Sequence, residues 1–340
     1  MTNIAAVMTA PETIVLHDHE LGPIKPYEAV VQVESVGVCG SDTAYFTVGM
    51  IGAYVVDGPL ILGHEAAGVV AEVGASVSTV RVGDRVAIEP GTPCRECREC
   101  QHGRYHLCRS LVFLATPPYN GALVERIQVD ARTLHPIPDT MTFDEAAMLE
   151  PLSVGIWAAQ RARLRPGDRA LVVGAGPVGL LSAAVLRAFG AGEVVITDLS
   201  PFRLELARSM GFVADSGVLS STEEFDVLLE CSGAEGTLAL GLNRLREDGR
   251  AAVVGMAKKP VTLPLSELNP KELTISLVNR YVNTWPTAID LVRTGRVDVT
   301  GLITHHFSLD QTADALLLAR NTPDSLKAII HPQKEGAVHD

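Results

Sequence analysis

The sequence predicts a two-domain α/β protein in which a β-rich domain is joined to a doubly wound parallel-sheet domain. Two observations lead to this fold class. Residues before about 150 form short strand-like runs broken by Pro and Gly, and residues 164–289 alternate apolar strands with helices. This alternation requires crossover connections, which give a parallel sheet with helices on both faces. A length of 340 residues fits two domains of roughly 100 to 200 residues each.

The first domain is expected to span residues 1–155 and to include the tail, 290–340. Runs of β-branched residues predict strands at 29–33 and 68–74, and a Gly-Asp turn leads into a third strand near Val86. The tail returns to mixed structure after the alternating region. We therefore expect it to rejoin the first domain.

The second domain is expected to span residues 156–289. Its predicted strands are four short apolar runs, at residues 170–173, 194–197, 225–229 and 250–254. Helical stretches such as 204–210 lie between them, and a further helical stretch, 146–161, leads into the domain across its start.

A glycine-rich turn, G-A-G-P-V-G, follows the first of these strands and opens a helix. Gly174 allows the tight turn, Gly176 lets the backbone approach a pyrophosphate, and Gly179 permits close helix–strand packing. The helix N-terminus attracts phosphate charge. Asp198 ends the next strand, where its carboxylate would bind the ribose hydroxyls and repel a 2′-phosphate, so NAD is expected rather than NADP. The expected cofactor-binding residues are Gly174, Gly176, Pro177, Val178, Gly179, Asp198 and Arg203.

The alternative for this segment is a structural glycine turn, with an Asp that only caps a loop. The strand, the spacing and the acid together favour the dinucleotide site.

Four cysteines form a short-spaced group, C-x2-C-x2-C-x7-C. Cys94, Cys97, Cys100 and Cys108 can surround one Zn²⁺ tetrahedrally from a single loop, which is typical of a closed structural site. An iron–sulfur cluster or disulfides are the alternatives. A reducing compartment makes disulfides less expected.

A second group mixes a thiol, an imidazole and carboxylates, as catalytic zinc sites do. Its candidates are Cys39, His64, Glu65 and Glu150. Each has another explanation: Cys39 as a buried core thiol, His64 and Glu65 as a solvated pair, and Glu150 as an acid at a helix start. The spacing alone leaves this second site undecided.

Composition excludes several functions. The chain is 47% hydrophobic and 20% charged, as is usual for a globular protein, with a net charge of −12 and no run of Lys or Arg. Neither nucleic acid nor an anionic membrane surface is therefore an expected partner. No signal peptide is recognised and no apolar run approaches the roughly 18 residues that span a bilayer, so we expect a cytoplasmic protein.

Over nearly its whole length the chain resembles the zinc-dependent medium-chain dehydrogenase/reductase superfamily. The motifs G-V-C-G-S-D, L-G-H-E-A-A-G and G-D-R-V-A-I-E-P-G, the cysteine group and the G-A-G-P-V-G turn follow in the superfamily's order. Three segments are similar to the sorbitol (polyol) dehydrogenase branch: A-T-P-P at 115–118, E-P-L-S-V-G at 150–155 and R-Y-V-N-T-W-P at 280–286. Ordinary alcohol dehydrogenases of the superfamily have a cysteine where this chain has Glu150.

The resemblance implies a GroES-like catalytic domain, a Rossmann domain, two zinc ions per chain and a homo-oligomer, either a tetramer or a dimer. It assigns the catalytic zinc to Cys39, His64 and Glu65, with Glu150 touching the metal or its bound water. Ser41 and Tyr45 would lie beside the reacting oxygen, and Arg280 and Tyr281 would face substrate hydroxyls and cofactor.

The implied reaction transfers a hydride from a secondary alcohol of a small-molecule polyol, such as sorbitol or xylitol, to NAD, giving a ketose. Alternatives are an L-threonine or simple secondary-alcohol dehydrogenase and, more remotely, a non-catalytic protein that binds NAD and zinc. The chain departs from the branch in three places. Ala44 replaces a common histidine, Tyr119-Asn120 replaces an acidic pair, and the stretch from 212 to 225 is short.

Overall fold

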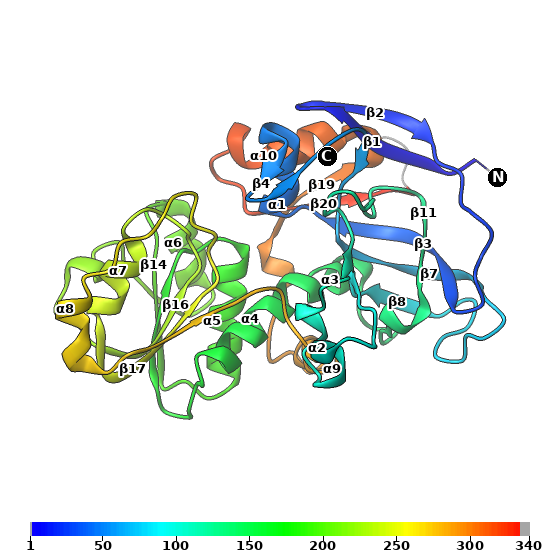
Figure 1. The fold of residues 1–340 in the computed structure, drawn as a ribbon. Coiled ribbons are helices and arrows are strands. Elements are labelled where there is room, and N and C mark those ends of the chain that lie inside the picture. The colour runs from blue at the N-terminus through cyan, green and yellow to red at the C-terminus, as the bar shows by residue number, and fades with distance from the viewer. Residues whose placement is uncertain (1, 334–340) are drawn as a thin grey trace. The chain divides into compact units, whose positions relative to one another are not determined.

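The computed structural model describes residues 2–333, which divide into two units (Figure 1). The first unit comprises Met1–Glu150 and Val299–Asp340, and the second comprises Pro151–Asp298. The described residues from Val299 onward therefore belong with the N-terminal unit, whereas residues 290–298, which the sequence assigned to the tail, belong with the second unit. Among residues 2–333, no helix combines the length and the apolar character that crossing a membrane requires.

A seven-stranded sheet organises the first unit. The strand order is β12-β8-β7-β3-β20-β19, and β11 also pairs with β3. All of these pairs are antiparallel except β19 with β20. The strands are β3 (Glu28–Gly37), β7 (Glu65–Val73), β8 (Arg85–Ile88), β11 (Arg126–Asp130), β12 (Leu134–Pro136), β19 (Ile303–Ser308) and β20 (Lys327–His331).

Smaller elements complete the first unit. A three-stranded sheet has the order β2-β1-β6, and two further antiparallel pairs are β4 with β5 and β9 with β10. Apolar side chains from β1, β3, β7, β11 and two helices share one buried core. These elements are β1 (Ile4–Ala10), β2 (Thr13–Asp18), β4 (Met50–Ile51), β5 (Tyr54–Val55), β6 (Leu60–Ile61), β9 (Gly91–Thr92), β10 (Val112–Phe113), α1 (Gly40–Val48), α2 (Arg98–Gln101), α3 (Phe143–Ala147) and α10 (Thr312–Asn321).

The second unit is a parallel six-stranded sheet with the order β15-β14-β13-β16-β17-β18 (Figure 1, green to yellow). This order is that of a Rossmann fold, with the topological switch between β13 and β16. The strands are β13 (Arg169–Val173), β14 (Glu193–Thr197), β15 (Val213–Ala214), β16 (Phe225–Glu230), β17 (Leu245–Val253) and β18 (Thr274–Leu277). The helices are α4 (Leu149–Arg161), which starts at the boundary, α5 (Pro177–Ala188), α6 (Pro201–Ser209), α7 (Thr237–Asn243), α8 (Leu265–Leu268) and α9 (Trp285–Arg293).

The fold class predicted from the sequence is confirmed by this architecture. Two local expectations differ from it. The single helical stretch expected at 146–161 is two helices, α3 and α4. Pro151 has no N–H to donate to the preceding turn, so the helix cannot run on unbroken, and the proline lies instead in the first turn of α4. Strand β17 begins at Leu245, five residues early, because Leu245 pairs with Phe225 before a break in register.

Candidate functional site

Cys39, His64 and Glu65 come together at one end of two central strands of the large sheet. Cys39 follows β3, whereas His64 and Glu65 stand at the start of β7. The two strands are antiparallel neighbours in which Gly37 pairs with Glu65, so the end of one meets the start of the other. The ligand atoms of the three side chains all lie within 4.8 Å of one another. A thiol, an imidazole and a carboxylate are the donor set of an open zinc site, and these residues fit that metal.

Gly37 makes room for this group. A Cβ atom at position 37 would lie 2.1 Å from Oε2 of Glu65 and 3.1 Å from Cε of Lys327. Glu65 and Lys327 are only 1% and 2% exposed, so neither side chain has space to withdraw. Any larger residue at position 37 would therefore displace the Glu65 carboxylate.

Asp42 orients two of the three candidate ligands. Its Oδ2 accepts a hydrogen bond from the backbone N–H of Cys39 at 3.1 Å, and its Oδ1 lies 3.4 Å from Nδ1 of His64. Oδ1 also accepts the N–H of Gly63 at 3.0 Å. Burial opposes protonation of His64, but the charge of Asp42 outweighs it and raises the pKa of the imidazole. A carboxylate on one ring nitrogen directs the other toward a metal, as in carboxylate–histidine–zinc arrangements.

Lys327 places a buried positive charge beside the same group. Its Nζ contacts Oε2 of Glu65 and donates a hydrogen bond to the carbonyl of Val38 at 2.9 Å. Burial disfavours the charged amine, but Glu65, Cys39 and also Glu150 outweigh it and raise the pKa of Lys327. The ammonium thus offsets the negative charge that the acidic ligands bring into the interior.

Glu150 lies near this group without joining it. The carboxyl is 6% exposed and sits in the first turn of α4, close enough to Lys327 to affect its pKa. It is not one of the three side chains whose ligand atoms fall within 4.8 Å of one another. Ser41 and Tyr45 are on α1, which starts directly after Cys39. Ser41 is half-buried, and Tyr45 is 4% exposed and packs in the core of the first unit.

Arg280 and Tyr281 lie in the second unit, in the segment between β18 and α9. Arg280 has a φ of 55°, in the left-handed region that a non-glycine side chain adopts only at a cost. Tyr281 is 3% exposed and packs edge-on against Trp285, with ring centroids 6.1 Å apart. The buried Tyr281 ring therefore anchors this segment to α9.

Residues 94–108, called the cysteine lobe below, contain Cys94, Cys97, Cys100 and Cys108, and these four cysteines form a closed cluster. The separations between their Sγ atoms are 3.4 Å for Cys94–Cys108, 3.5 Å for Cys97–Cys100 and 3.9 Å for Cys94–Cys100. Thiolates around a tetrahedral zinc ion are about 3.8 Å apart, given Zn–S bonds of about 2.3 Å. Disulfides, with S–S near 2.05 Å, are excluded, and all four cysteines are free. The geometry fits zinc.

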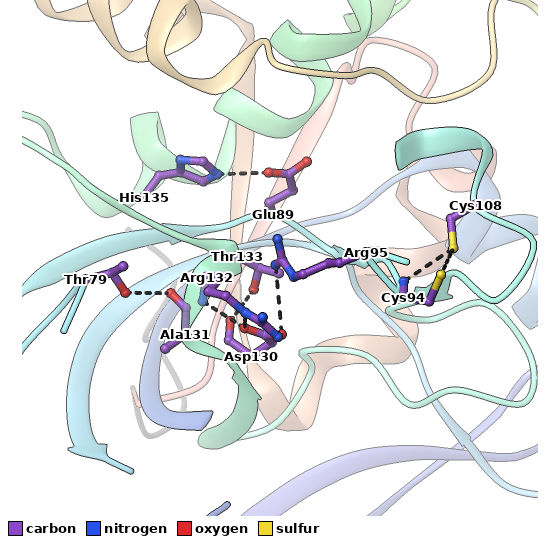
Figure 2. A network of polar contacts seen from close by, with 10 residues as sticks. All are labelled: Thr79, Glu89, Cys94, Arg95, Cys108, Asp130, Ala131, Arg132, Thr133 and His135. Atoms are coloured by element: carbon purple, nitrogen blue, oxygen red, sulfur yellow. Dashed lines mark hydrogen bonds and ion pairs between the residues drawn. The ribbon is translucent and has the colours of Figure 1, made fainter. Parts of the chain in front are cut away.

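An ion-pair network ties this lobe to the large sheet (Figure 2). Arg95 lies 3.9 Å from the Asp130 carboxylate at the end of β11, which also binds the Arg132 side chain. Nearby, Glu89 accepts a hydrogen bond from the Tyr105 hydroxyl at 2.8 Å and lies 2.9 Å from Nε2 of His135. The lobe is thus attached by charged and hydrogen-bonded contacts at its base.

The glycine-rich turn joins β13 to α5 as the sequence predicted. A Cβ atom at Gly179 would lie 1.8 Å from the Gly174 carbonyl oxygen, and one at Gly174, where φ is +100°, would press on Ser232. A Cβ atom at Gly176 would meet nothing within 4 Å. Gly174 and Gly179 are therefore needed for close packing, whereas Gly176 leaves open space at the N-terminus of α5. This helix begins at Pro177, and Val178 is its second residue. This arrangement fits a dinucleotide pyrophosphate.

Asp198 follows β14 and faces this turn. Its Oδ2 accepts the N–H of Ala175 at 2.7 Å, and its Oδ1 accepts the N–H of Ser200 at 2.8 Å. Arg203, on α6, lies 3.9 Å from the same carboxylate. Asp198 thus does cap its loop, and each of its oxygens keeps a second lone pair with which to bind a ribose hydroxyl.

The loops after β16 and β17 line a cavity of about 610 Å³ in the second unit, between residues 232–236 and 256–262. Glu230, 2% exposed, holds the first loop by accepting the N–H groups of Ser232 and Gly233 at 3.0 Å and the Thr237 hydroxyl at 3.1 Å. Ligands of open parallel sheets bind at this carboxyl end of the strands.

Sequence reasoning missed Asp42, Lys327 and Glu230 as supporting residues. Asp42 stood inside a quoted motif, and its position three residues after Cys39 could have indicated a helix-capping acid. Nothing local marks Lys327, which reaches Glu65 from more than 260 residues further along the chain. Asn120, which departs from the sorbitol dehydrogenase pattern, accepts the N–H of Ile61 at 3.0 Å and so has a role in the fold.

Comparisons with known proteins agree with this geometry. Residues 25–139 match the alcohol dehydrogenase GroES-like domain, and residues 177–294 match the zinc-binding dehydrogenase family. The chain is 40% identical to sorbitol dehydrogenase of Bacillus subtilis (strain 168) over 97% of both chains. It is 37% identical to L-idonate 5-dehydrogenase of Vitis vinifera, over 91% of this chain and 88% of that one.

The fold is also similar to a solved structure from Escherichia coli, an oxidoreductase/dehydrogenase of unknown specificity involved in membrane biogenesis. That structure has a TM-score of 0.93 and 31% identity, covering 98% of this chain and all of the other. The chain belongs to the zinc-dependent medium-chain dehydrogenase/reductase superfamily, in its sorbitol dehydrogenase-like branch.

Proposed function

We propose that this protein oxidises a secondary alcohol group of a polyol to a ketose, with NAD as hydride acceptor. The observation that carries the proposal is the group of the half-buried Cys39 and the buried His64 and Glu65, with the Glu150 carboxyl nearby. A carboxylate in place of a cysteine at position 150 is the mark of the polyol branch. The similarity to sorbitol and L-idonate dehydrogenases over most of the chain supports the same substrate class.

Different residues of the chain are proposed for metal binding, proton transfer and substrate binding. Cys39, His64 and Glu65 would hold a zinc ion, which when bound would supply the Lewis acidity that lowers the pKa of a substrate hydroxyl. Glu150 and Ser41 receive the hydroxyl proton and pass it toward solvent. The Rossmann unit holds the nicotinamide cofactor that accepts the hydride. Because polyols carry several hydroxyls, Arg280 and Tyr281 are the candidates to bind those that do not react.

A panel of substrates tests the proposal. NADH formation followed at 340 nm should be fastest with sorbitol, xylitol or another polyol, and absent in Cys39→Ser. Faster turnover of L-threonine or 2-butanol would replace the polyol assignment by an amino-alcohol or simple alcohol dehydrogenase. No reduction of NAD by any alcohol would favour a non-catalytic zinc- and NAD-binding role.

Asp198 supports NAD over NADP. A 2′-phosphate would meet the Asp198 carboxylate, and unpaired like charges in contact cost several kcal/mol. Asp198→Ala should therefore raise kcat/KM for NADP relative to NAD. Arg203, 3.9 Å from the carboxylate, is the group that would then face the phosphate, so the double change with Arg203→Ala should lose part of the gain. Equal use of both cofactors by the unmodified enzyme would refute the assignment.

We propose in addition that the enzyme works in the cytoplasm as a homo-oligomer, a tetramer or else a dimer, following the resemblance to its superfamily. Light scattering coupled to size-exclusion chromatography measures the mass directly. A mass near that of the 36.2 kDa chain would contradict the proposed assembly.

A further inference from the structure

A second set of metal-ligand side chains lies in the first unit, apart from both proposed zinc sites. Asp144, His306 and His331 come from α3, β19 and β20, and their ligand atoms all lie within 4.8 Å of one another. None of the three has a part in the function proposed above. The feature that calls for an explanation is why two imidazoles and a carboxylate converge from three elements.

The sheet register brings the two histidines together. In the parallel pair of β19 and β20, His306 is opposite Ile329 and His331 is opposite Ser308. Paired residues share a face, and alternate residues along a strand return to it, so His306 and His331 project on the same side. Their rings stack with centroids 5.3 Å apart and planes inclined by 13°. His305, the residue before His306 on β19, projects to the opposite face.

Both imidazoles direct Nε2 at the Asp144 carboxylate. The Nε2 atom of His306 is 3.0 Å from Oδ2, and that of His331 is 2.8 Å from Oδ1. Ser35 donates its hydroxyl to Oδ1 at 2.6 Å and so holds the carboxylate in place. Nitrogen and oxygen ligands of a tetrahedral zinc ion are about 3.3 Å apart, given bonds of about 2.0 to 2.1 Å. A shift of a few tenths of an ångström would admit the ion.

The surroundings leave the group accessible. It borders a cavity of about 460 Å³ that is also lined by Glu34 and Ser308, and the His306 side chain is 50% exposed. Water can therefore reach the remaining coordination positions. Imidazole and carboxylate together suit Zn²⁺, Ni²⁺ and Cu²⁺ rather than Mg²⁺ or Ca²⁺. Burial opposes ionisation of Asp144, but hydrogen bonds from His331 and Ser35 outweigh it and lower its pKa to about 2, so the carboxylate is charged near neutral pH.

We propose that Asp144, His306 and His331 form a third metal site, which binds a divalent transition-metal ion of the Zn²⁺ type. The site is separate from Cys39, His64 and Glu65, called the catalytic group below. Lys327 contacts Glu65 of that group, and His331 is four residues along β20 from Lys327, roughly 13 Å at 3.3 Å per residue. An ion at this position would cross-link α3 to the β19–β20 edge. It would favour the folded state, in which alone the three ligands meet.

Metal binding by the whole, zinc-loaded protein tests the site. Equilibrium dialysis against Zn²⁺, and separately Ni²⁺, followed by elemental analysis should give one more ion per chain in the unmodified protein than in His306→Ala. The matched control is His305→Ala, which removes an imidazole from the neighbouring position on the other face and should bind like the unmodified protein. Changes in outer-shell partners cost about 10- to 100-fold in metal affinity, so loss of a ligand should weaken binding by at least about 100-fold.

A second variant separates metal binding from the hydrogen-bonded network. Asp144→Asn keeps the shape of the side chain and an acceptor for one histidine but loses the charge, so it should fold and bind the added ion at least about 10-fold more weakly. Added Ni²⁺ should raise the unfolding temperature of the unmodified protein and of His305→Ala, but not that of His306→Ala. Equal metal content in all four proteins would overturn the proposal and leave a hydrogen-bonded cluster only. The readout is stoichiometry, so it is independent of any dehydrogenase activity.

Discussion

The cysteine lobe and the catalytic group hold their candidate ligands in opposite ways. The lobe draws Cys94, Cys97, Cys100 and Cys108 from a stretch of 15 residues, and three of the four are only partly buried. The catalytic group draws Cys39, His64 and Glu65 from the ends of two paired strands, and the latter two are buried.

The difference lies in what surrounds the ligands. Around the lobe sulfurs the backbone itself supplies hydrogen bonds, such as the N–H of Cys97 to Sγ of Cys94 at 3.4 Å. Around the catalytic group, side chains do so. Asp42 is near Cys39 in the sequence but also accepts the N–H of Gly63, and Lys327 comes from the last strand. A local loop is therefore sufficient for a closed site that stabilises the fold. A site that must also tune a reacting group depends on charges arranged by tertiary structure.

The largest expected effect is on the lobe. Cys97→Ser removes one of four thiolates, and loss of a structural metal is among the few single changes that cost about 4 kcal/mol or more. We expect a large drop in the free energy of unfolding, with zinc retained by the catalytic group. Calorimetry and elemental analysis measure both. The exposed neighbour Glu96→Ala is the control and should match the unmodified protein. Unchanged stability of Cys97→Ser would remove the contrast between the two regions.

A change beside the catalytic group should lower activity and leave stability nearly unchanged. Glu150→Ala should lower kcat by about 100-fold or more, as for lost acid–base help, while NAD binding and thermal stability change little. Because Glu150 lies outside the 4.8 Å group, zinc should remain bound, and Glu150→Gln should be equally inactive because it cannot take a proton. Loss of zinc from Glu150→Ala under mild chelation would instead identify a direct ligand, and full activity would show that the acid serves only the start of α4.

Lys327 sharpens the comparison because it acts through Glu65. Lys327→Met leaves the buried Glu65 carboxylate without its ammonium partner, so this carboxylate is less well oriented toward the metal. We expect the zinc affinity of the catalytic group to fall by about 10- to 100-fold, as for other outer-shell partners, with the lobe zinc unaffected. Competition with a chelator measures the affinity. Lys327→Arg retains the charge and should restore most of it. Equal zinc retention in the Met variant would limit Lys327 to packing.

The smallest effect is expected at the base of the lobe. Burial opposes ionisation of Asp130, but the bonds and charge of Arg132 outweigh it and lower its pKa. Asp130→Asn keeps an acceptor for the Arg132 N–H, 2.9 Å away, but removes the charge and one of the two oxygens that accept from the Arg132 guanidinium. We expect a loss of about 1 kcal/mol in the free energy of unfolding, because Arg132 is partly exposed.

The same prediction has a pH dependence. A carboxylate whose pKa is lowered by folding stabilises the protein above its unfolded pKa of about 3.9, and this contribution is lost as the pH falls below it. The difference in stability between the unmodified protein and Asp130→Asn should therefore shrink below about pH 4. A constant difference down to pH 2 would mean that the Asp130 charge is not its source.

Much of the architecture could be predicted because its signals are local. The four predicted strands of the second unit, the glycine turn at 174–179 and the spacing of the lobe cysteines all depend on neighbouring residues, and the fold contains each of them, although β17 starts five residues early and β15 and β18 were not predicted. The division of 146–161 into two helices was missed, although Pro151 marked it. The reason is that a proline in the first turn of a helix and a proline that ends one look alike in composition.

The sequence by itself determined the fold class, the two sets of candidate zinc ligands and, through its resemblance, the superfamily. The tertiary structure decided which distant groups complete the sites. Lys327 meets Glu65 only because β20 pairs with β3, which pairs with β7, and Asp144 meets two histidines only because β19 and β20 lie side by side in register. Such contacts arise from strand pairing between segments far apart in the chain, and no local pattern of residues encodes that pairing.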